Sequence, residues 1–352
     1  MIFYLSKSHH QYTIRYRLLQ DFGLPLDCRW ELLARIRLLS YEKLFRLTRL
    51  PLGTYVFADL ERLDPEETER AAIVWRTLAE SGSGARLLNH PVRSMRRFEL
   101  LQQLREQGIN DFDVCRLTDL RPLRFPVFIR SEGDHSGSLT PLLGSPAELE
   151  AAIQRLVAEG TSRDDKLVVE FRDVRDGQGM YHRYGAHIVG SRVFASNLVF
   201  ARHWVVRTWE PALQEGALLA AEQRYVESNP HEALLRPIFT MAGIEYGRMD
   251  YAVVDGRIQI FEINTNPVAP AGAHLLAGAR EIDCELDATR RIPVTARFKP
   301  AWREDLSSAH WVSRGVHAVL YRLGLLGIER RVQSALRGTK RRLAAMAKGL
   351  LT

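Results

Sequence analysis

The stretch YGRMDYAVVDGRIQIFEINTNP, residues 246–267, places polar side chains inside two runs that otherwise have the composition of β-strands. Asp250, Glu262 and Asn264 lie among aliphatic and aromatic neighbours, where a strand that only filled a core would hold apolar residues. Two carboxylates and an amide are hard oxygen donors, which suit Mg²⁺. The nearby guanidinium of Arg248 suits the oxygens of a phosphoryl group in transfer. Whether these groups converge depends on the register of the two strands.

The register of this hairpin depends on the length of its turn, because the Asp-Gly pair at 255–256 is a strong hairpin signal. A two-residue turn pairs Val254 with Arg257 and sets the two carboxylates on opposite faces. A three-residue turn, 254–256, shifts the register by one residue and brings the metal-ligand residues and the arginine to one face. We expect the three-residue turn because it brings the hard oxygen ligands together on one face. Taken alone, the hairpin favours the alternative of an ordinary hairpin with one solvated face.

Composition limits the class of protein. The chain has 352 residues, of which 46% are hydrophobic and 26% are charged, as in a globular protein with room for two or three lobes. Cys28, Cys115 and Cys284 are too widely spaced for a disulfide framework or a zinc pattern, which favours a reducing cytoplasm. No apolar run approaches the length of a membrane span. We therefore expect a cytoplasmic protein.

The net charge of +7 belongs to the C-terminal tail. From Arg314 to the end there are nine Lys/Arg and one acidic residue, Glu329, whereas the rest of the chain holds 40 basic and 41 acidic residues. The body has no broad basic surface, so we do not expect nucleic-acid binding. The tail has a helical composition that Gly338 divides. It favours packing on the body or in a homo-oligomer, with a helix on the inner membrane surface as the alternative and RNA as a weaker third.

Strand and helix signals alternate along the chain. The expected strands are 53–60, 85–91 and 166–173, with a hairpin over 181–200 around Gly190-Ser191. Residues 126–143 predict a strand that runs into a glycine- and serine-rich loop. The expected helices are 64–82 with Asp64 as N-cap, 94–108 with Ser94 as N-cap and Gly108 as its end, and 145–160. The βαβα order before residue 110 predicts an α/β layer. Residues 1–50 receive no assignment.

The opening stretch resembles the C-terminal metal-binding hairpin of the ATP-grasp superfamily. The closest pattern is R-x-D … E-x-N-T-x-P of D-alanine–D-alanine ligases, and ribosomal-protein glutamate ligases are a similar type. The pattern is matched here by Arg248, Asp250, Glu262, Asn264, Thr265 and Pro267. The resemblance implies that Asp250, Glu262 and Asn264 hold one or two Mg²⁺ ions, or Mn²⁺ in their place. It also implies that Arg248 stabilises the transferring group.

Three upstream motifs follow the order of the same superfamily. RRFELLQQLREQGI resembles its helix with a phosphate-contacting lysine, and Arg97 stands at that lysine's place. PVFIRSEGDHSGS resembles the strand and flexible loop that close over the triphosphate, with Arg130 where lysine is usual. LVVEF resembles the hinge that contacts adenine through Glu170 and the backbone of Phe171. The nucleotide contacts that the resemblance implies are Arg97, Arg130, Ser131, Gly133, His135, Ser136, Gly137, Glu170, Phe171 and Asp173.

The resemblance covers roughly residues 53–270 and implies an α/β fold of ATP-grasp type with three lobes and a basic helical extension. The implied domains are an N-terminal α/β domain at 1–118, a lid lobe at 119–172, a C-terminal lobe with the metal hairpin at 173–270, and the extension at 271–352.

The activity that the resemblance implies is ligation of a carboxylate to an amine or similar nucleophile. ATP and Mg²⁺ would activate the carboxylate as an acyl phosphate. A small-molecule kinase on the same fold and a non-catalytic nucleotide-binding protein are the alternatives. Arginine replaces both superfamily lysines, which is not a neutral exchange. Val268 stands where the D-alanine enzymes often have glycine, so D-alanine is not expected as the substrate.

Overall fold

The computed structural model describes residues 1–14, 25–135, 137–206, 216–268, 272–284, 286 and 289–294. These residues belong to the compact unit Met1–Phe298. The predicted tail helices, with their proposed membrane or oligomer contacts, lie outside the described residues. Ser136 lies outside them too; it belongs to the loop 131–138, which we call the lid loop. No helix in the described part of the chain is long and apolar enough to span a membrane.

The N-terminal part is built around a parallel four-stranded sheet with the order β2-β1-β4-β5. Its strands are β1 (Ile2–Ser6), β2 (Ile36–Ser40), β4 (Thr54–Phe57) and β5 (Arg86–Leu88). Alternate side chains of β1 belong to different cores, with Tyr4 in one cluster and Leu5 in another. Because both faces are covered, β1 is hydrophobic from Ile2 to Leu5, which is typical of parallel strands.

Helices cover both faces of this sheet. Leu32 of α2 (Leu26–Arg35) and Leu275 of α9 (Gly272–Ile282) join the core on the Tyr4 face. α3 (Tyr41–Leu44) and α4 (Pro65–Glu80) join the core on the Leu5 face. α4 confirms its prediction, because the Asp64 side chain forms a capping box with Glu67.

The remaining elements of this part are short. They are η1 (Ser8–His10), η2 (Leu60–Arg62), β3 (Arg49–Pro51) and β13 (Arg291–Pro293). β13 pairs antiparallel with β3. Residues beyond 270 therefore return to the N-terminal part through α9 and β13.

The lid lobe is a three-stranded antiparallel sheet with the order β6-β8-β7, against which α6 packs. Its elements are β6 (Val114–Arg116), β7 (Val127–Ser131), α6 (Pro146–Ala158) and β8 (Lys166–Glu170). Ser145 caps α6 by accepting a hydrogen bond from the Glu148 N–H.

The helix before the lid lobe, α5 (Arg97–Glu106), starts later than the sequence predicts. Its N-cap position is held by Arg96, without a capping side chain. Ser94 instead donates to the carbonyl of Gly243 at 2.7 Å, so its predicted N-cap role is wrong. Gly108 follows the helix with φ 67°, as the sequence predicts for its end.

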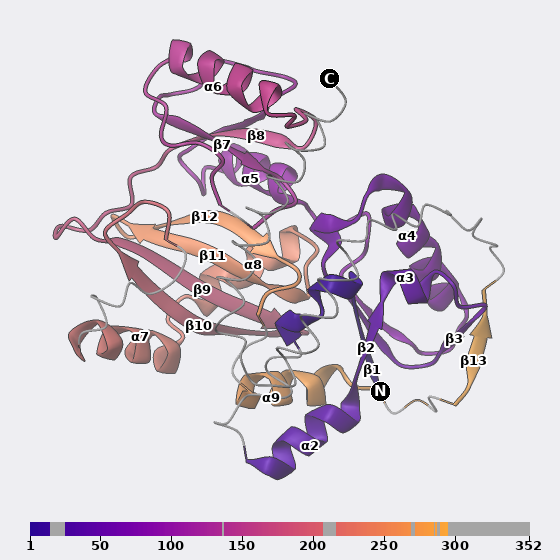
Figure 1. The fold of residues 1–352 in the computed structure, drawn as a ribbon. Coiled ribbons are helices and arrows are strands. Elements are labelled where there is room, and N and C mark those ends of the chain that lie inside the picture. Colours follow the sequence, from indigo (N-terminus) through magenta and orange to yellow (C-terminus); the bar gives the residue numbers. More distant parts are fainter. Residues whose placement is uncertain are drawn as a thin grey trace, which may run out of the picture. The chain divides into compact units, whose positions relative to one another are not determined.

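A four-stranded antiparallel sheet, β10-β9-β11-β12, carries the candidate site (Figure 1). Its strands are β9 (Tyr181–Val189), β10 (Arg192–Ala201), β11 (Tyr246–Val254) and β12 (Arg257–Asn264). α7 (Gly216–Ser228) and α8 (Glu232–Met241) pack on it, and their Tyr225 and Phe239 share a core with Met249 and Tyr251. The other side chains of β11 therefore lie on the opposite face. Parallel and antiparallel sheets together confirm the predicted α/β class.

Candidate active site

The β11–β12 hairpin closes through a two-residue turn. Val254 pairs with Arg257, and Asp255 and Gly256 both have positive φ, at 51° and 74°. Two left-handed residues are typical of the type I′ turn, whose twist matches that of the flanking strands. The three-residue turn that we expect from the sequence is therefore wrong.

A β-bulge in β12 restores the convergence that the turn alone would prevent. Tyr251 pairs with Ile260, but Asp250 pairs with Glu262, so Phe261 is an extra residue. One extra residue reverses the alternation of β12 relative to β11 and re-aims the side chains that follow.

The register beyond the bulge puts the predicted metal ligands on one face. Asp250 lies opposite Glu262, and Arg248 lies opposite Asn264. Paired residues of antiparallel strands project to the same side of the sheet. The predicted shared face is thus confirmed, and its cause is a bulge in the strand and not the length of the turn.

A second bulge lies in β10, between Ala195 and Asn197. Asn197 pairs with Gly185, which pairs on its other side with Asp250, so a row runs from Asn197 across the sheet to Glu262. A Cβ at Gly185 would lie 2.2 Å from Asn197 Oδ1. Glycine is therefore needed for the amide to lie over this strand. The sequence analysis missed Asn197, because the bulge that aims it leaves no clear sequence signal.

Three cations surround Glu262. Its Oε2 accepts hydrogen bonds from the guanidinium of Arg97 and, at 2.8 Å, from that of Arg130. Its Oε1 lies 3.3 Å from His135 Nδ1. Burial would raise the pKa of the Glu262 carboxyl, but both arginines and His135 hold it well below its usual value. Glu262 is therefore ionised, and the positive charges around it balance its negative charge.

The cations themselves are affected by this crowding. Burial and the neighbouring charge of Arg97 lower the pKa of Arg130 to about 10, against the attraction of Glu262. Burial would also lower the pKa of His135, but its bonds to Glu262 and Glu61 raise it to about 9. Arg130 and His135 are therefore both positive at neutral pH. The lid loop and β7 thus bring concentrated positive charge to the metal hairpin.

Arg97, the first residue of α5, also holds the lid loop. Its Nη1 donates to the carbonyls of Ser131 at 2.8 Å, of Asp134 at 3.1 Å, and of Glu132. The side chain is buried. The two arginines at the superfamily lysine positions therefore come together, as the resemblance implies, with one of them clamping the loop.

Asp250 is held by two further guanidinium groups. Arg248 binds it in a bidentate manner, with Nε 2.7 Å from Oδ1 and Nη2 2.9 Å from Oδ2. Arg183 on β9 donates to Oδ2 at 2.6 Å. Burial would raise the pKa of Asp250, but these two arginines lower it. His182, also on β9, has its Nε2 2.7 Å from Asp176 Oδ2.

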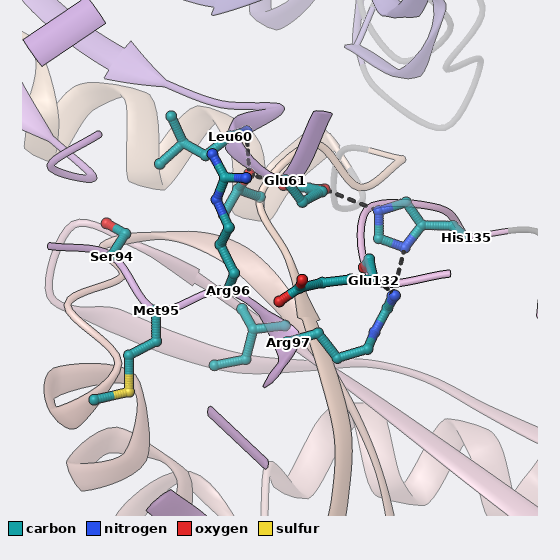
Figure 2. Close-up of a pocket in the computed structure, with 10 residues that line it drawn as sticks. Leu60, Glu61, Ser94, Met95, Arg96, Arg97, Glu132 and His135 are labelled. Carbon is teal, nitrogen blue, oxygen red and sulfur yellow. Dashed lines mark hydrogen bonds and ion pairs between the residues drawn. The ribbon is translucent and has the colours of Figure 1, made fainter. Parts of the chain in front are cut away.

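The N-terminal part contributes Glu61, which the sequence analysis missed. Its Oε1 lies 2.8 Å from His135 Nε2, and its carboxylate also accepts from Thr265 Oγ1. The Leu60 N–H donates to the same threonine oxygen at 3.0 Å. Figure 2 shows His135 between Glu61 and Arg97 in a pocket that Thr265 also lines. A single acidic residue in an N-terminal loop gives no sequence signal for this contact.

The residues predicted to contact adenine have other partners. The Glu170 carboxylate accepts from the backbone N–H of Arg124 at 2.6 Å and from its Nη2 at 2.8 Å. It also accepts from the Asp113 N–H at 3.0 Å. Asp173 pairs with Arg175 at 2.5 Å. The nucleotide roles of Glu170 and Asp173 stay predictions.

Phe171 lies in an apolar cluster beside the metal hairpin. Its ring centroid is 5.8 Å from that of Trp204 in an edge-on contact. Val254 and the bulged Phe261 pack against the same cluster, whose buried members include Ala252. Such a surface suits the face of an aromatic base, and the adenine contact of Phe171 stays a prediction.

The lid loop approaches the N-terminal part closely. A Cβ at Gly133 would lie 2.3 Å from the carbonyl oxygen of Glu61. Gly137 has φ 89°, a conformation that favours glycine. The predicted contact residue Ser136, between them, lies outside the described residues. Both glycines are therefore needed for the loop to take this path.

The charges of the site fit a triphosphate. Five cations meet three carboxylates here, namely Arg97, Arg130, His135, Arg183 and Arg248 with Glu61, Asp250 and Glu262. The Nε atoms of Arg97 and Arg130 are buried without a hydrogen-bond partner in the described structure. Excess buried positive charge with unused N–H donors is suited to phosphate oxygens.

The three predicted metal ligands have the donor chemistry that a magnesium ion requires. Asp250, Glu262 and Asn264 offer the hard oxygens that Mg²⁺ takes, although the described residues contain no cluster of three His, Cys, Asp or Glu side chains that could hold a metal. Asn264 Oδ1 already accepts from the Asn266 N–H at 2.7 Å. Both carboxylates are occupied by guanidinium groups, so a metal requires these groups to turn toward an anionic ligand.

Comparison with known proteins was made at the levels of family, sequence and structure. No family model matches the chain, and no curated protein matches it in sequence. Among solved structures, D-alanine–D-alanine ligase from Bacillus anthracis, complexed with ATP, is 13% identical, with 80% of this chain and 96% of that chain covered and a TM-score of 0.44. A RimK domain ATP-grasp protein from Sphaerobacter thermophilus DSM 20745 is 14% identical, with 80% and 99% covered and a TM-score of 0.41.

A second D-alanine–D-alanine ligase, from Coxiella burnetii, is 20% identical, with 57% of this chain and 56% of that chain covered and a TM-score of 0.35. These proteins are of the kinds that the motifs resemble. At such identities and TM-scores they carry no argument about activity, so we base the function on the residues of this chain.

Proposed function

We propose that this protein is an ATP- and Mg²⁺-dependent ligase of ATP-grasp type that joins a carboxylate to an amine or similar nucleophile. The observation that carries the proposal is the convergence of Arg97, Arg130 and His135 on Glu262. These three cations come from a helix, a strand and a loop that are separate in sequence, and they meet at the bulged metal hairpin.

The cations would bind the phosphates of ATP. When a triphosphate enters, its oxygens compete with Glu262 for Arg97 and Arg130, whose Nε–H groups are available. Glu262 would then be released to a metal ion together with Asp250 and Asn264. Bound Mg²⁺ would neutralise charge on the β- and γ-phosphates. In this scheme the ion pairs of the nucleotide-free protein hold the site in place until nucleotide arrives.

Arg248 and Arg183 would act on the carboxylate substrate. A carboxylate oxygen attacks the γ-phosphorus, the bond to the ADP oxygen breaks, and an acyl phosphate forms. The nucleophile then attacks the acyl carbon, and inorganic phosphate leaves with the electron pair of the broken bond. The two guanidinium groups beside Asp250 would stabilise the charge that develops in both steps.

The test is a trapping assay with hydroxylamine. The protein is incubated with ATP, Mg²⁺, hydroxylamine and a panel of carboxylates, and hydroxamate and ADP are measured together. We expect one carboxylate to give equal amounts of both. The Glu262→Gln variant should lose the reaction, and the exposed Glu66→Gln variant should keep it.

The other outcomes separate the alternative functions. AMP in place of ADP would contradict the acyl phosphate. A stable phosphorylated product that hydroxylamine does not trap would favour the kinase. Nucleotide binding without any product would favour a non-catalytic protein.

A further inference from the structure

The parallel N-terminal sheet has a topological switch point between β1 and β4. The chain leaves β1 for β2 on one side and leaves β4 for β5 on the other. In open α/β sheets, the crevice outside the carboxyl ends of the strands at such a point is where ligands bind. The segments that line it here are 7–10, after β1, and 58–62, after β4. The sequence analysis gave neither segment a role.

Asp59 belongs to the second of these segments. It is completely buried and has a left-handed backbone, with φ 61°. This conformation is uncommon for a residue other than glycine, and it persists where the surroundings enforce it. The carboxylate lies 3.0 Å from His10 Nδ1 and accepts from Arg62 at 2.7 Å and from the Lys7 N–H at 3.0 Å.

The contact with Asp59 orients the imidazole of His10. With Nδ1 at the carboxylate, Nε2 points to the opposite side of the ring, and no described residue hydrogen-bonds to it. The His10 side chain is 18% exposed, so a ligand can reach it. A carboxylate at one ring nitrogen fixes the tautomer and makes the other nitrogen a better proton acceptor.

The His10 segment is tied directly to the metal hairpin. Asn266 Nδ2 donates to the His10 carbonyl at 3.2 Å, and the Asn266 N–H donates to Asn264 Oδ1 at 2.7 Å. On the other side of the crevice, Glu61 follows Asp59 by two residues and reaches His135. Of the two carboxylates that follow β4, that of Asp59 therefore contacts the imidazole of His10, and that of Glu61 contacts His135, one of the cations proposed to bind phosphate.

We propose that this crevice binds the amine acceptor and that His10 Nε2, oriented by Asp59, takes a proton from the ammonium form of the acceptor, which frees the nitrogen lone pair to attack the acyl phosphate. The proposal rests on the ligase function proposed above. The nitrogen lone pair forms the bond to the acyl carbon, and the carbon–oxygen bond to phosphate breaks with its electron pair. One proton moves from the ammonium nitrogen to His10 and then to water, and the second, released as the amide forms, is taken by the departing phosphate, so no other reactant is needed.

The test compares two small nucleophiles with the carboxylate found in the trapping assay. Methylamine is mostly protonated near neutral pH and needs a base, whereas hydroxylamine is mostly neutral and does not. His10→Asn retains a donor at the position of Nδ1 and removes Nε2. We expect it to lower N-methylamide formation by about 100-fold or more while hydroxamate formation changes less than about threefold. Glu66→Gln, the exposed control of the trapping assay, should change neither rate.

Melting temperature and ATP binding are measured for each variant, and His10→Gln is used if His10→Asn does not fold. Equal N-methylamide rates in the variant and the unchanged protein would overturn the proposal. So would an equal loss of both products, since His10 would then act in activation. An unchanged protein that makes hydroxamate but no N-methylamide would also contradict it. If the unchanged protein makes neither product with any carboxylate, the ligase function itself fails.

Discussion

His135 Nε2 lies 2.8 Å from Glu61 Oε1, and this contact joins the lid loop to the N-terminal sheet. The other ring nitrogen of His135 faces Glu262 at 3.3 Å. One imidazole therefore connects the lid loop, the metal hairpin and the loop after β4. We therefore expect closure of this loop over bound phosphates to be coupled to the crevice proposed for the acceptor.

Glu61→Gln should loosen the lid loop. The substitution removes the charge from a hydrogen bond to a cationic ring, and such bonds contribute about 1.5–3 kcal/mol. We expect amide hydrogen exchange in the lid-loop peptides to become about 10-fold faster or more, with no change in α6. Unchanged exchange in both segments would show that the contact does not restrain the loop.

Gly133→Ala should loosen the same loop by a steric route. The new methyl group would lie 2.3 Å from the carbonyl oxygen of Glu61, so the loop must move away from the N-terminal part. Gly144→Ala is the matched control, since its Cβ would lie 3.6 Å from a flexible carboxylate oxygen of Glu148. Faster exchange of the lid loop in both variants would mean that the effect is not specific to the approach at Glu61.

Glu262→Gln should destabilise the nucleotide-free protein as well as stop turnover. It leaves Arg97, Arg130 and His135 buried without their shared counter-charge. Breaking a buried ion pair costs about 3–5 kcal/mol, which urea unfolding can measure. ATP without Mg²⁺ should raise the melting temperature of this variant more than that of the unchanged protein, because the triphosphate restores the missing negative charge. A variant as stable as the unchanged protein would contradict the ion-pair description.

Asp59 should make stability depend on pH in the acid range. Burial would raise its pKa, but His10 and Arg62 lower it from the usual 3.8 to about 2. Because the folded-state pKa is the lower one, the stabilisation is complete above about pH 4 and is lost as the pH falls toward 2. It is worth about 2 kcal/mol, of which about half is lost by pH 3. Urea unfolding between pH 6 and pH 3 should show a flatter profile for Asp59→Asn than for the unchanged protein.

Much of the fold could be predicted because local signals agree with it. The capping box of Asp64 and the cap of Ser145 define two helices, and Gly190-Ser191 lies in the turn between β9 and β10. The order of the motifs along the chain also predicts that Arg97 and Arg130 belong to one site. These features depend on short stretches of chain and on charge.

The failures have a different origin. The register of β12 depends on the bulge at Phe261, whose ring packs near that of Phe112 with centroids 6.2 Å apart. The alternation of polar and apolar residues along a strand does not predict the position of a bulge that packs against a residue distant in sequence. Ser94 looks like an N-cap, but its hydroxyl bonds to Gly243, far away in sequence. Glu61 is equally hidden, because its partners come from two other parts of the chain.

The most direct test of the site is calorimetric titration with a non-hydrolysable ATP analogue, with and without Mg²⁺, for the unchanged protein and for Arg130→Ala. We predict one binding site whose affinity increases with Mg²⁺ and falls at least about 10-fold in the variant, because a charge-assisted phosphate contact is lost. Absence of binding, or equal affinity for both proteins, would contradict the assignment of this cation cluster to the triphosphate.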